Sequence, residues 1–213
     1  MIEILIQSTF ETLYMVFGAT LIAFLIGGPV AVITYVTRPD GLKPNKAVFS
    51  VFDFVINIFR SVPFVILMIL LMPLSRLIVG KSIGTTASIV PLTIASAPFM
   101  ARMFEASFLK VDKGRLEAAK SMGSKVKQII TKVIIPESLP YLINDITITI
   151  INLIGYSAMA GSLGGGGLGN MAVRFGLYNY KFNYLISAVI VIIVLVQVIQ
   201  LVGTFISKKI NKN

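Results

Sequence analysis

The chain has 213 residues, of which 56% are hydrophobic and 13% charged, and its mean hydropathy is +0.89. Soluble domains are about half apolar and about a quarter charged, so this composition indicates a membrane protein of a single domain, residues 1–213. The absence of cysteine and histidine excludes thiolate metal sites and removes the commonest general base, so we expect no catalysis by this chain alone and no metal site.

Five hydrophobic stretches are long enough to cross a bilayer, which needs about 20 residues. They are residues 13–36, a span within 49–79, and residues 85–108, 139–159 and 184–206. We expect the second span in the later part of 49–79, because Pro63 and Pro73 interrupt that segment. The N-terminus lacks the basic start and small-residue cleavage site of a signal peptide, so the first stretch should stay in the mature protein. The sequence therefore predicts an all-α membrane protein with five transmembrane helices and a core of about residues 12–206.

Lysine and arginine are distributed unevenly between the two sides of this topology. One side has 13 basic residues, in the loop after the first span, in the loop after the third span and in the C-terminal tail: Arg38, Lys43, Lys46, Lys110, Lys113, Arg115, Lys120, Lys125, Lys127, Lys132, Lys208, Lys209 and Lys212. The other side has four: Arg76, Lys81, Arg174 and Lys181. Cytoplasmic loops carry the excess of basic residues, so we expect the N-terminus outside the cell membrane and the C-terminus in the cytoplasm. The net charge of +10 then reflects topology and the anionic inner leaflet rather than nucleic-acid binding.

The loop at about residues 110–136 contains a polar, amphipathic segment between the third and fourth spans. Asp112 can cap a first short helix, Gly123 suits the left-handed residue that ends it, and Ser124 can cap a second. Pro136 should mark the break before the fourth span. The second helix carries an apolar stripe at helical spacing: Val126, Ile129, Ile130 and Val133. Such a pair of helices either rests on lipid or on the other helices, or docks in the groove of a partner protein.

This segment resembles the signature loop of the permeases of ATP-binding-cassette importers. The pattern is Glu117-Ala118-Ala119, three residues, Gly123, nine residues, and an apolar-x-apolar-proline ending at Pro136. Stretches 35–39, 57–64, 90–102 and 155–169 are further similar to methionine-importer permeases, so the resemblance covers nearly the whole chain.

The resemblance implies a permease that imports methionine, as either enantiomer, by alternating access. It implies three kinds of protein partner: a second copy of the chain, two cytoplasmic ATPase subunits that bind ATP and Mg, and an extracytoplasmic methionine-binding protein. The residues that it places at the ATPase are Glu117, Ala118, Ala119, Gly123, Ile129, Ile130 and Pro136. We expect Glu117 to orient the loop through hydrogen bonds or a salt link.

Several polar residues fall within the predicted spans, where charges are expensive and face protein or water. Arg60 and Arg102 either extend toward the cytoplasmic interface or pair with Asp53, Glu105 or Asp145. Candidates for the pathway are Asn57, Arg60, Ser61, Pro63, Asn152, Tyr156 and Ser157. For the polar residues of the fourth span, ordinary hydrogen bonds between helices are the alternative.

Met159 precedes a glycine-rich turn near the outer end of the fourth span. Because a thioether side chain is flexible, Met159 and its copy in a second subunit could form an outer gate; ordinary packing is the alternative. The turn contains Gly164, Gly165, Gly166, Gly167 and Gly169. Its G-x-G-x-x-G spacing is not a nucleotide fingerprint, because that motif requires a preceding strand. The glycines either pack tightly or contact the binding protein or the outer gate.

Three other functions are weaker hypotheses. A permease for another small amino acid would share the same loop. An ion-coupled secondary transporter would need intramembrane ion relays and usually inverted repeats, and an intramembrane enzyme would need a nucleophile with a base. The sequence offers little for either.

Overall fold

A computed structural model describes residues 1–211, and these residues contain helices and no strand. Lys212, counted above among the basic residues of the tail, lies outside the described residues. The helices in chain order are α1 (Ile2–Thr37), α2 (Lys46–Ser61), α3 (Phe64–Val79), α4 (Thr85–Phe108), α5 (Lys113–Ser121), α6 (Val126–Ile129), η1 (Ile130–Ile134), α7 (Ile135–Ala160), η2 (Gly161–Gly165), α8 (Gly167–Met171), η3 (Ala172–Tyr178) and α9 (Phe182–Ile210).

Within residues 1–211, four helices are long and apolar enough to cross a membrane. They are Ile2–Thr37, Thr85–Phe108, the continuous Val126–Gly165 and Phe182–Ile210. The pair α2 and α3 is bent by 108° and would make a fifth span if it crosses as one unit. The all-helical membrane architecture predicted from the sequence is thus confirmed.

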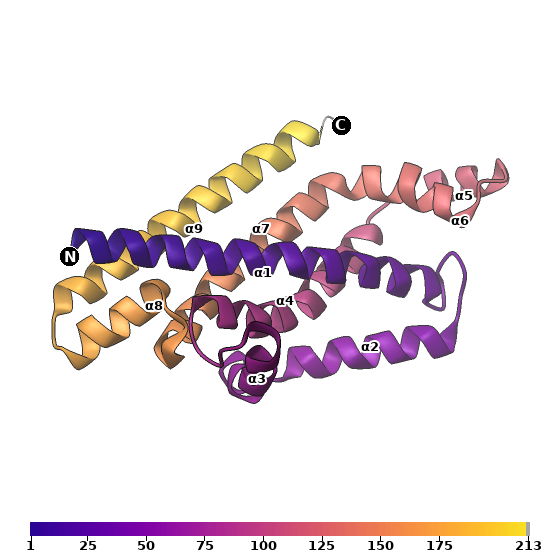
Figure 1. The fold of residues 1–213 in the computed structure, drawn as a ribbon. Coiled ribbons are helices and arrows are strands. Elements are labelled where there is room, and N and C mark those ends of the chain that lie inside the picture. The colour runs from indigo at the N-terminus through magenta and orange to yellow at the C-terminus, as the bar shows by residue number, and fades with distance from the viewer. Residues whose placement is uncertain (212–213) are drawn as a thin grey trace.

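The second predicted span differs from the expectation. Helix α2 runs alongside α1, whereas α3 turns away at Pro63 and is seen nearly end-on (Figure 1). The earlier part of residues 49–79 therefore follows the long helices, and the later part does not. Proline at position 63 restricts the preceding residue, Val62, to an extended conformation (φ −85°, ψ 124°), which breaks the helix there.

The bundle is centred on the contact between α1 and α4. Gly27 of α1 faces the backbone of α4 so closely that a Cβ atom there would lie 2.7 Å from the carbonyl oxygen of Ala97. Buried side chains form one cluster around Met100, Phe104 and Phe108, and a second around Met15 and Leu92.

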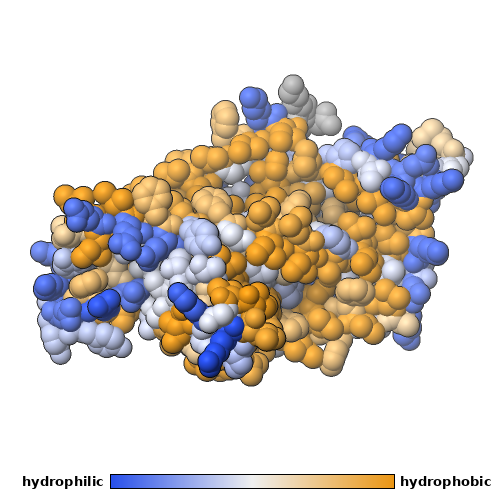
Figure 2. Space-filling view, viewed as in Figure 1, coloured by the Kyte–Doolittle hydropathy of each residue, from blue (hydrophilic) through white to orange (hydrophobic). Residues whose placement is uncertain are grey.

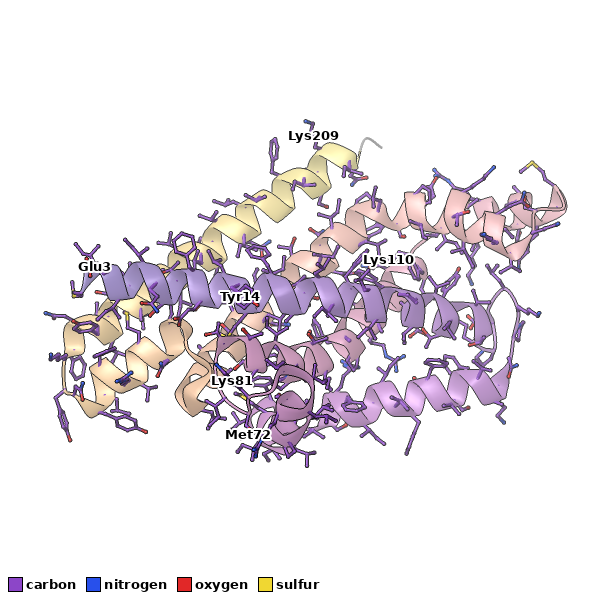
Figure 3. The ribbon with its side chains drawn as sticks, viewed as in Figure 1. Glu3, Tyr14, Met72, Lys81, Lys110 and Lys209 are labelled. Atoms are coloured by element: carbon purple, nitrogen blue, oxygen red, sulfur yellow. The ribbon has the colours of Figure 1, made fainter. Side chains whose placement is uncertain are left out.

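The surface is apolar along most of the bundle and hydrophilic at its two ends. Figure 2 shows an orange surface between blue groups at the left and right ends, with a smaller blue group below the centre, over α3. Glu3 is labelled at the end of the bundle where α1 starts, and Lys110 lies toward the other end (Figure 3). This distribution is that of a protein whose long helices lie in hydrocarbon and whose ends lie in water.

Candidate coupling surface and translocation pathway

The first short helix of the loop forms as predicted. The Asp112 carboxylate accepts a hydrogen bond from the backbone N–H of Arg115 (3.0 Å), which caps α5. At the other end, Gly123 has a φ of 74°. The N–H of Ser124 donates to the carbonyl of Ala119 (3.1 Å) and that of Gly123 donates to Lys120 (2.9 Å), the pattern of a helix ended by a left-handed glycine.

The start of the second short helix differs by one residue from the prediction. Lys125, and not Ser124, is the N-cap residue of α6. Its backbone N–H donates to Oε1 of Gln128 (2.8 Å), so a glutamine side chain three residues later satisfies the free donor.

The predicted break at Pro136 is wrong. The helix runs from α6 through the π-helical turn η1 into α7 without interruption, and it forms one continuous segment, Val126–Gly165. The N–H of Ile135 reaches back five residues to the carbonyl of Ile130. Proline has no N–H to donate and its ring crowds the preceding turn; the wider π turn just before Pro136 lets the helix pass it. The second short helix is therefore continuous with α7.

The apolar stripe of this segment packs on the chain's own core. Ile129 is 2% exposed and belongs to the cluster around Phe108, and Ile130 and Val133 pack against that cluster. Of the two uses considered for the stripe, packing on the other helices is the one that the structure shows. The outward surface instead presents Glu117, Ala118 and Met122, whose side chain is 78% exposed.

The ion pair that links α5 to α7 joins Arg115 and Glu137. Glu117 is exposed, and no ion pair or side-chain hydrogen bond among residues 1–211 includes it. The salt link that we expected from Glu117 is thus made by Arg115 within this chain. The Glu117 carboxylate remains available at the surface. The sequence did not predict the ion pair of Glu137. The one signal for it was an acidic residue in the first turn of a helix, where negative charge is favourable.

The pathway candidates come from two parts of the chain, and one residue of each part, Arg60 and Tyr156, borders the same small cavity. Asn57, Arg60, Ser61 and Pro63 are exposed near the junction of α2 and α3. On α7, exposed Asn152 and Met159 and partly buried Tyr156 lie at helical spacing along one face. In a single subunit these residues lie on surfaces that no other part of the described chain fully covers.

Ser157 does not share that surface. It is 2% exposed, and its hydroxyl donates to the carbonyl of Ile154 (2.7 Å). For Ser157 the structure shows an ordinary hydrogen bond within the helix.

The two arginines of the spans differ in their surroundings. Arg102 bridges α2 and α4, because it pairs with Asp53 and, at 3.0 Å, with Glu105, whose side chain is 5% exposed. The pairing interpretation therefore holds for Arg102. Arg60 takes part in no ion pair among residues 1–211. Asp145 is buried and accepts a hydrogen bond from the Ser107 hydroxyl (2.6 Å).

The glycine-rich turn is held by α1. The N–H of Gly167 donates to the Glu11 carboxylate (2.7 Å), and that of Leu168 donates to the Thr12 hydroxyl (2.9 Å). Gly165, Gly167 and Gly169 are buried, Gly166 is partly buried and Gly164 is exposed. Tight packing explains most of the turn. The sequence did not reveal the role of Glu11, because the contact joins residues 156 positions apart.

Together, the all-helical bundle, its apolar girdle and a polar helical projection at one end define a membrane permease component rather than an enzyme. Residues 27–212 match the family described as the binding-protein-dependent transport system inner membrane component. The chain belongs to this family.

Relatives in two bacteria cover almost the whole chain. It is 46% identical over 209 residues to the probable D-methionine transport system permease protein MetI of Vibrio cholerae, covering 98% of this chain and 93% of that protein. It is also 46% identical over 206 residues to the methionine import system permease protein MetP of Bacillus subtilis, with 97% and 93% covered.

A solved structure of inward-facing conformations of the MetNI methionine ABC transporter contains a chain with the same fold. The TM-score is 0.98 at 42% identity, with 100% of this chain and 98% of that chain covered. An amino acid ABC transporter at 22% identity has a TM-score of 0.81, which shows the fold alone.

Proposed function

We propose that this chain is the membrane permease subunit of an ATP-driven importer of methionine. The observation that carries the proposal is the match to a chain of a methionine ABC transporter over the full length, at a TM-score of 0.98. Relatives named for D-methionine and for methionine both match at 46% identity, so the substrate class is methionine in either enantiomer. ATP and Mg belong to the partner ATPase.

We propose five membrane crossings, with the bent pair α2 and α3 as the second. The N-terminus lies outside and the C-terminus in the cytoplasm. The excess of basic residues in the loops after α1 and α4 supports this orientation. Residues 1–213 form one permease domain, and residues of about 110–136 contact the ATPase.

The surface of a single subunit supports a second copy as a partner. Only 6% of the most apolar stretch of α9 is buried within the chain, so lipid and neighbouring subunits must cover it. Asn152 and Met159 add polar and flexible side chains to an open face of α7, as expected of a pathway between two copies. We place the extracytoplasmic binding protein at the end that carries the glycine-rich turn.

Movement of the ATPase subunits reaches the bundle through the short helices. Ala118 and Met122 present the outward face, Glu117 is free to contact a partner, and Gly123 forms the turn. Ala119, Ile129 and Ile130 support this face from the core side, and Pro136 lies where α6 becomes continuous with α7. Displacement of the tip is therefore transmitted directly to the fourth span, which exposes the pathway alternately to the two sides.

Met159 at the outer end of α7 is our candidate for the outer gate. Its side chain is 45% exposed in the single subunit, as a gate shared with a second copy requires. The Met159→Ala variant should raise ATP hydrolysis in the absence of binding protein, measured on the reconstituted complex. Unchanged basal hydrolysis would count against the gate.

Transport by purified components tests the proposed function. Proteoliposomes containing the chain and its ATPase should accumulate radiolabelled methionine when ATP and Mg are inside and the binding protein is outside. The Glu117→Lys variant should insert and assemble but lose most of its uptake, whereas Lys208→Gln, in the last turn of α9, should not. No uptake by the unsubstituted complex would reject the importer, and full uptake by Glu117→Lys would reject the role of Glu117.

A further inference from the structure

A small cavity lies where α2 meets α3, and one charged side chain borders it. The cavity has a volume of about 150 Å³. Its lining residues come from the α2–α3 junction, α4 and α7: Phe59, Arg60, Val62, Phe64, Ala95, Phe99 and Tyr156. The junction lies along the middle of the bundle, between its hydrophilic ends (Figures 1 and 2). A pathway through the membrane must pass this depth.

The charge of Arg60 has no counter-ion within residues 1–211. Arg102, the other arginine of the spans, binds both Asp53 and Glu105. Charged side chains inside membranes are costly, and one that is not paired within its own chain points to a functional contact. The guanidinium of Arg60 is therefore available to an anionic group that enters the cavity.

The rest of the cavity lining is largely aromatic. The rings of Phe64 and Tyr156 stack with centroids 4.6 Å apart and planes 6° apart. Phe64 is 7% exposed, so the stack is held in place by the surrounding core. Aromatic rings make favourable contacts with thioether sulfur and with aliphatic carbon, and a guanidinium binds carboxylate through two parallel hydrogen bonds.

We propose that this cavity is a transit site in the permease, in which Arg60 binds the carboxylate of the transported amino acid and the Phe64–Tyr156 stack contacts its side chain. The inference rests on the proposed function, because it assigns contacts for the substrate of an amino-acid importer. It gives the permease a recognition step of its own, separate from that of the binding protein.

Photocrosslinking tests the site on the purified complex of the permease with its ATPase, without binding protein. A diazirine analogue of methionine should label peptides from the α2–α3 junction and from α7. Excess methionine and norleucine should suppress labelling, because both carry the carboxylate and an apolar side chain. Methioninol, which lacks the carboxylate, should compete at least about tenfold less well. Equal competition by methioninol, or labelling elsewhere only, would overturn the proposal.

Variants of the same complex test Arg60 directly. Arg60→Gln should lower the labelling about tenfold or more, and Arg60→Lys should have a smaller effect, because it keeps the charge but not the planar fork. Arg76→Gln is the matched control, since Arg76 lies in the last turn of α3 and outside the cavity. Wild-type labelling of Arg60→Gln would overturn the proposal. If Arg60→Gln fails to assemble, the methioninol competition decides.

Uptake in proteoliposomes distinguishes a failure of this inference from a failure of the proposed function. Suppose that the unsubstituted complex imports methionine, but that labelling is unchanged by Arg60→Gln and is suppressed equally by methioninol. The proposed transit site is then wrong, and the proposed importer function is retained. If the unsubstituted complex does not import methionine, the proposed function itself fails.

Discussion

Gly27 and Gly28 are adjacent on α1 but meet different surroundings. A Cβ atom on Gly27 would lie 2.7 Å from the carbonyl oxygen of Ala97, whereas one on Gly28 would meet nothing within 4 Å. Both positions lie inside the helix, so alanine gains about 0.5–1 kcal/mol of helix propensity at either. At position 27 the gain is exceeded by the cost of separating α1 from α4, about 1–3 kcal/mol.

We therefore expect Gly27→Ala to lower the thermal midpoint of the purified complex and Gly28→Ala to leave it unchanged or raise it. Differential scanning fluorimetry with a thiol-independent dye would measure both. Equal midpoints for the two variants would mean that α1 and α4 are not in close contact in the membrane.

At this scale, the sequence predicts local contacts better than distant ones. Asp112 and Gly123 were identified correctly because a cap and a left-handed turn depend on a few neighbouring residues. The hydroxyl of Ser124 predicts a cap for the second helix because hydroxyls are common caps, but in the structure the cap residue is Lys125, whose N–H donates to the side chain of Gln128. Whether Gly27 or Gly28 faces α4 depends on the rotation of two packed helices, which no local pattern specifies.

Between elements, Arg102 of α4 binds Asp53 of α2 and is also the cationic partner of Glu105. Removing its charge leaves Glu105, whose side chain is 5% exposed, without its cationic partner, and an unpaired buried charge is strongly destabilising. The Arg38–Asp40 pair is a useful comparison, because Asp40 is 67% exposed and surface pairs contribute at most about 1 kcal/mol.

We expect Arg102→Gln to destabilise the complex by about 3 kcal/mol and Arg38→Gln to have little effect. Adding Glu105→Gln to Arg102→Gln should restore part of the loss, because it removes the uncompensated charge. Thermal unfolding of the three variants measures this, and a double variant no more stable than Arg102→Gln would contradict the explanation.

The course of the helices was only partly predictable. The hydropathy of α1 indicated a span from residue 13, but the helix begins at Ile2, and its first turns mix apolar residues such as Ile4 and Leu5 with polar ones such as Glu3 and Gln7. Pro63 predicted an interruption but not a bend of 108°. Pro136 also lacks an N–H, yet it does not interrupt its helix, because the π turn at Ile130–Ile134 accommodates the proline.

The topology of the whole molecule can be tested because the chain contains no cysteine. Met122, in the turn after α5, and Tyr178, before α9, are 78% and 69% exposed. An impermeant maleimide added to intact cells should label Tyr178→Cys and not Met122→Cys. Opened membranes without the ATPase should label both, and labelling of Met122→Cys from outside would contradict the proposed orientation.

The sequence predicts the membrane-spanning segments well, but it does not predict which molecules cover their outer faces. The Ile, Val and Leu run of α9 is unmistakable as a span, yet its sides are mostly open within one chain. Residues such as Asn152 and Met159 lie on similar open surfaces. Their neighbours belong to other molecules, so neither the sequence pattern nor the intrachain packing determines them.

The hydrogen bond from Gly167 to Glu11 joins the beginning of the chain to its last quarter. During synthesis α1 is inserted long before the ribosome has produced its glycine partner, and domains assemble as their segments emerge. Until then the Glu11 carboxylate has the amide of Gln7 (3.0 Å), one turn earlier in the same helix, as its hydrogen-bond donor. The clasp between α1 and α8 is consequently among the last contacts to form in the nascent permease.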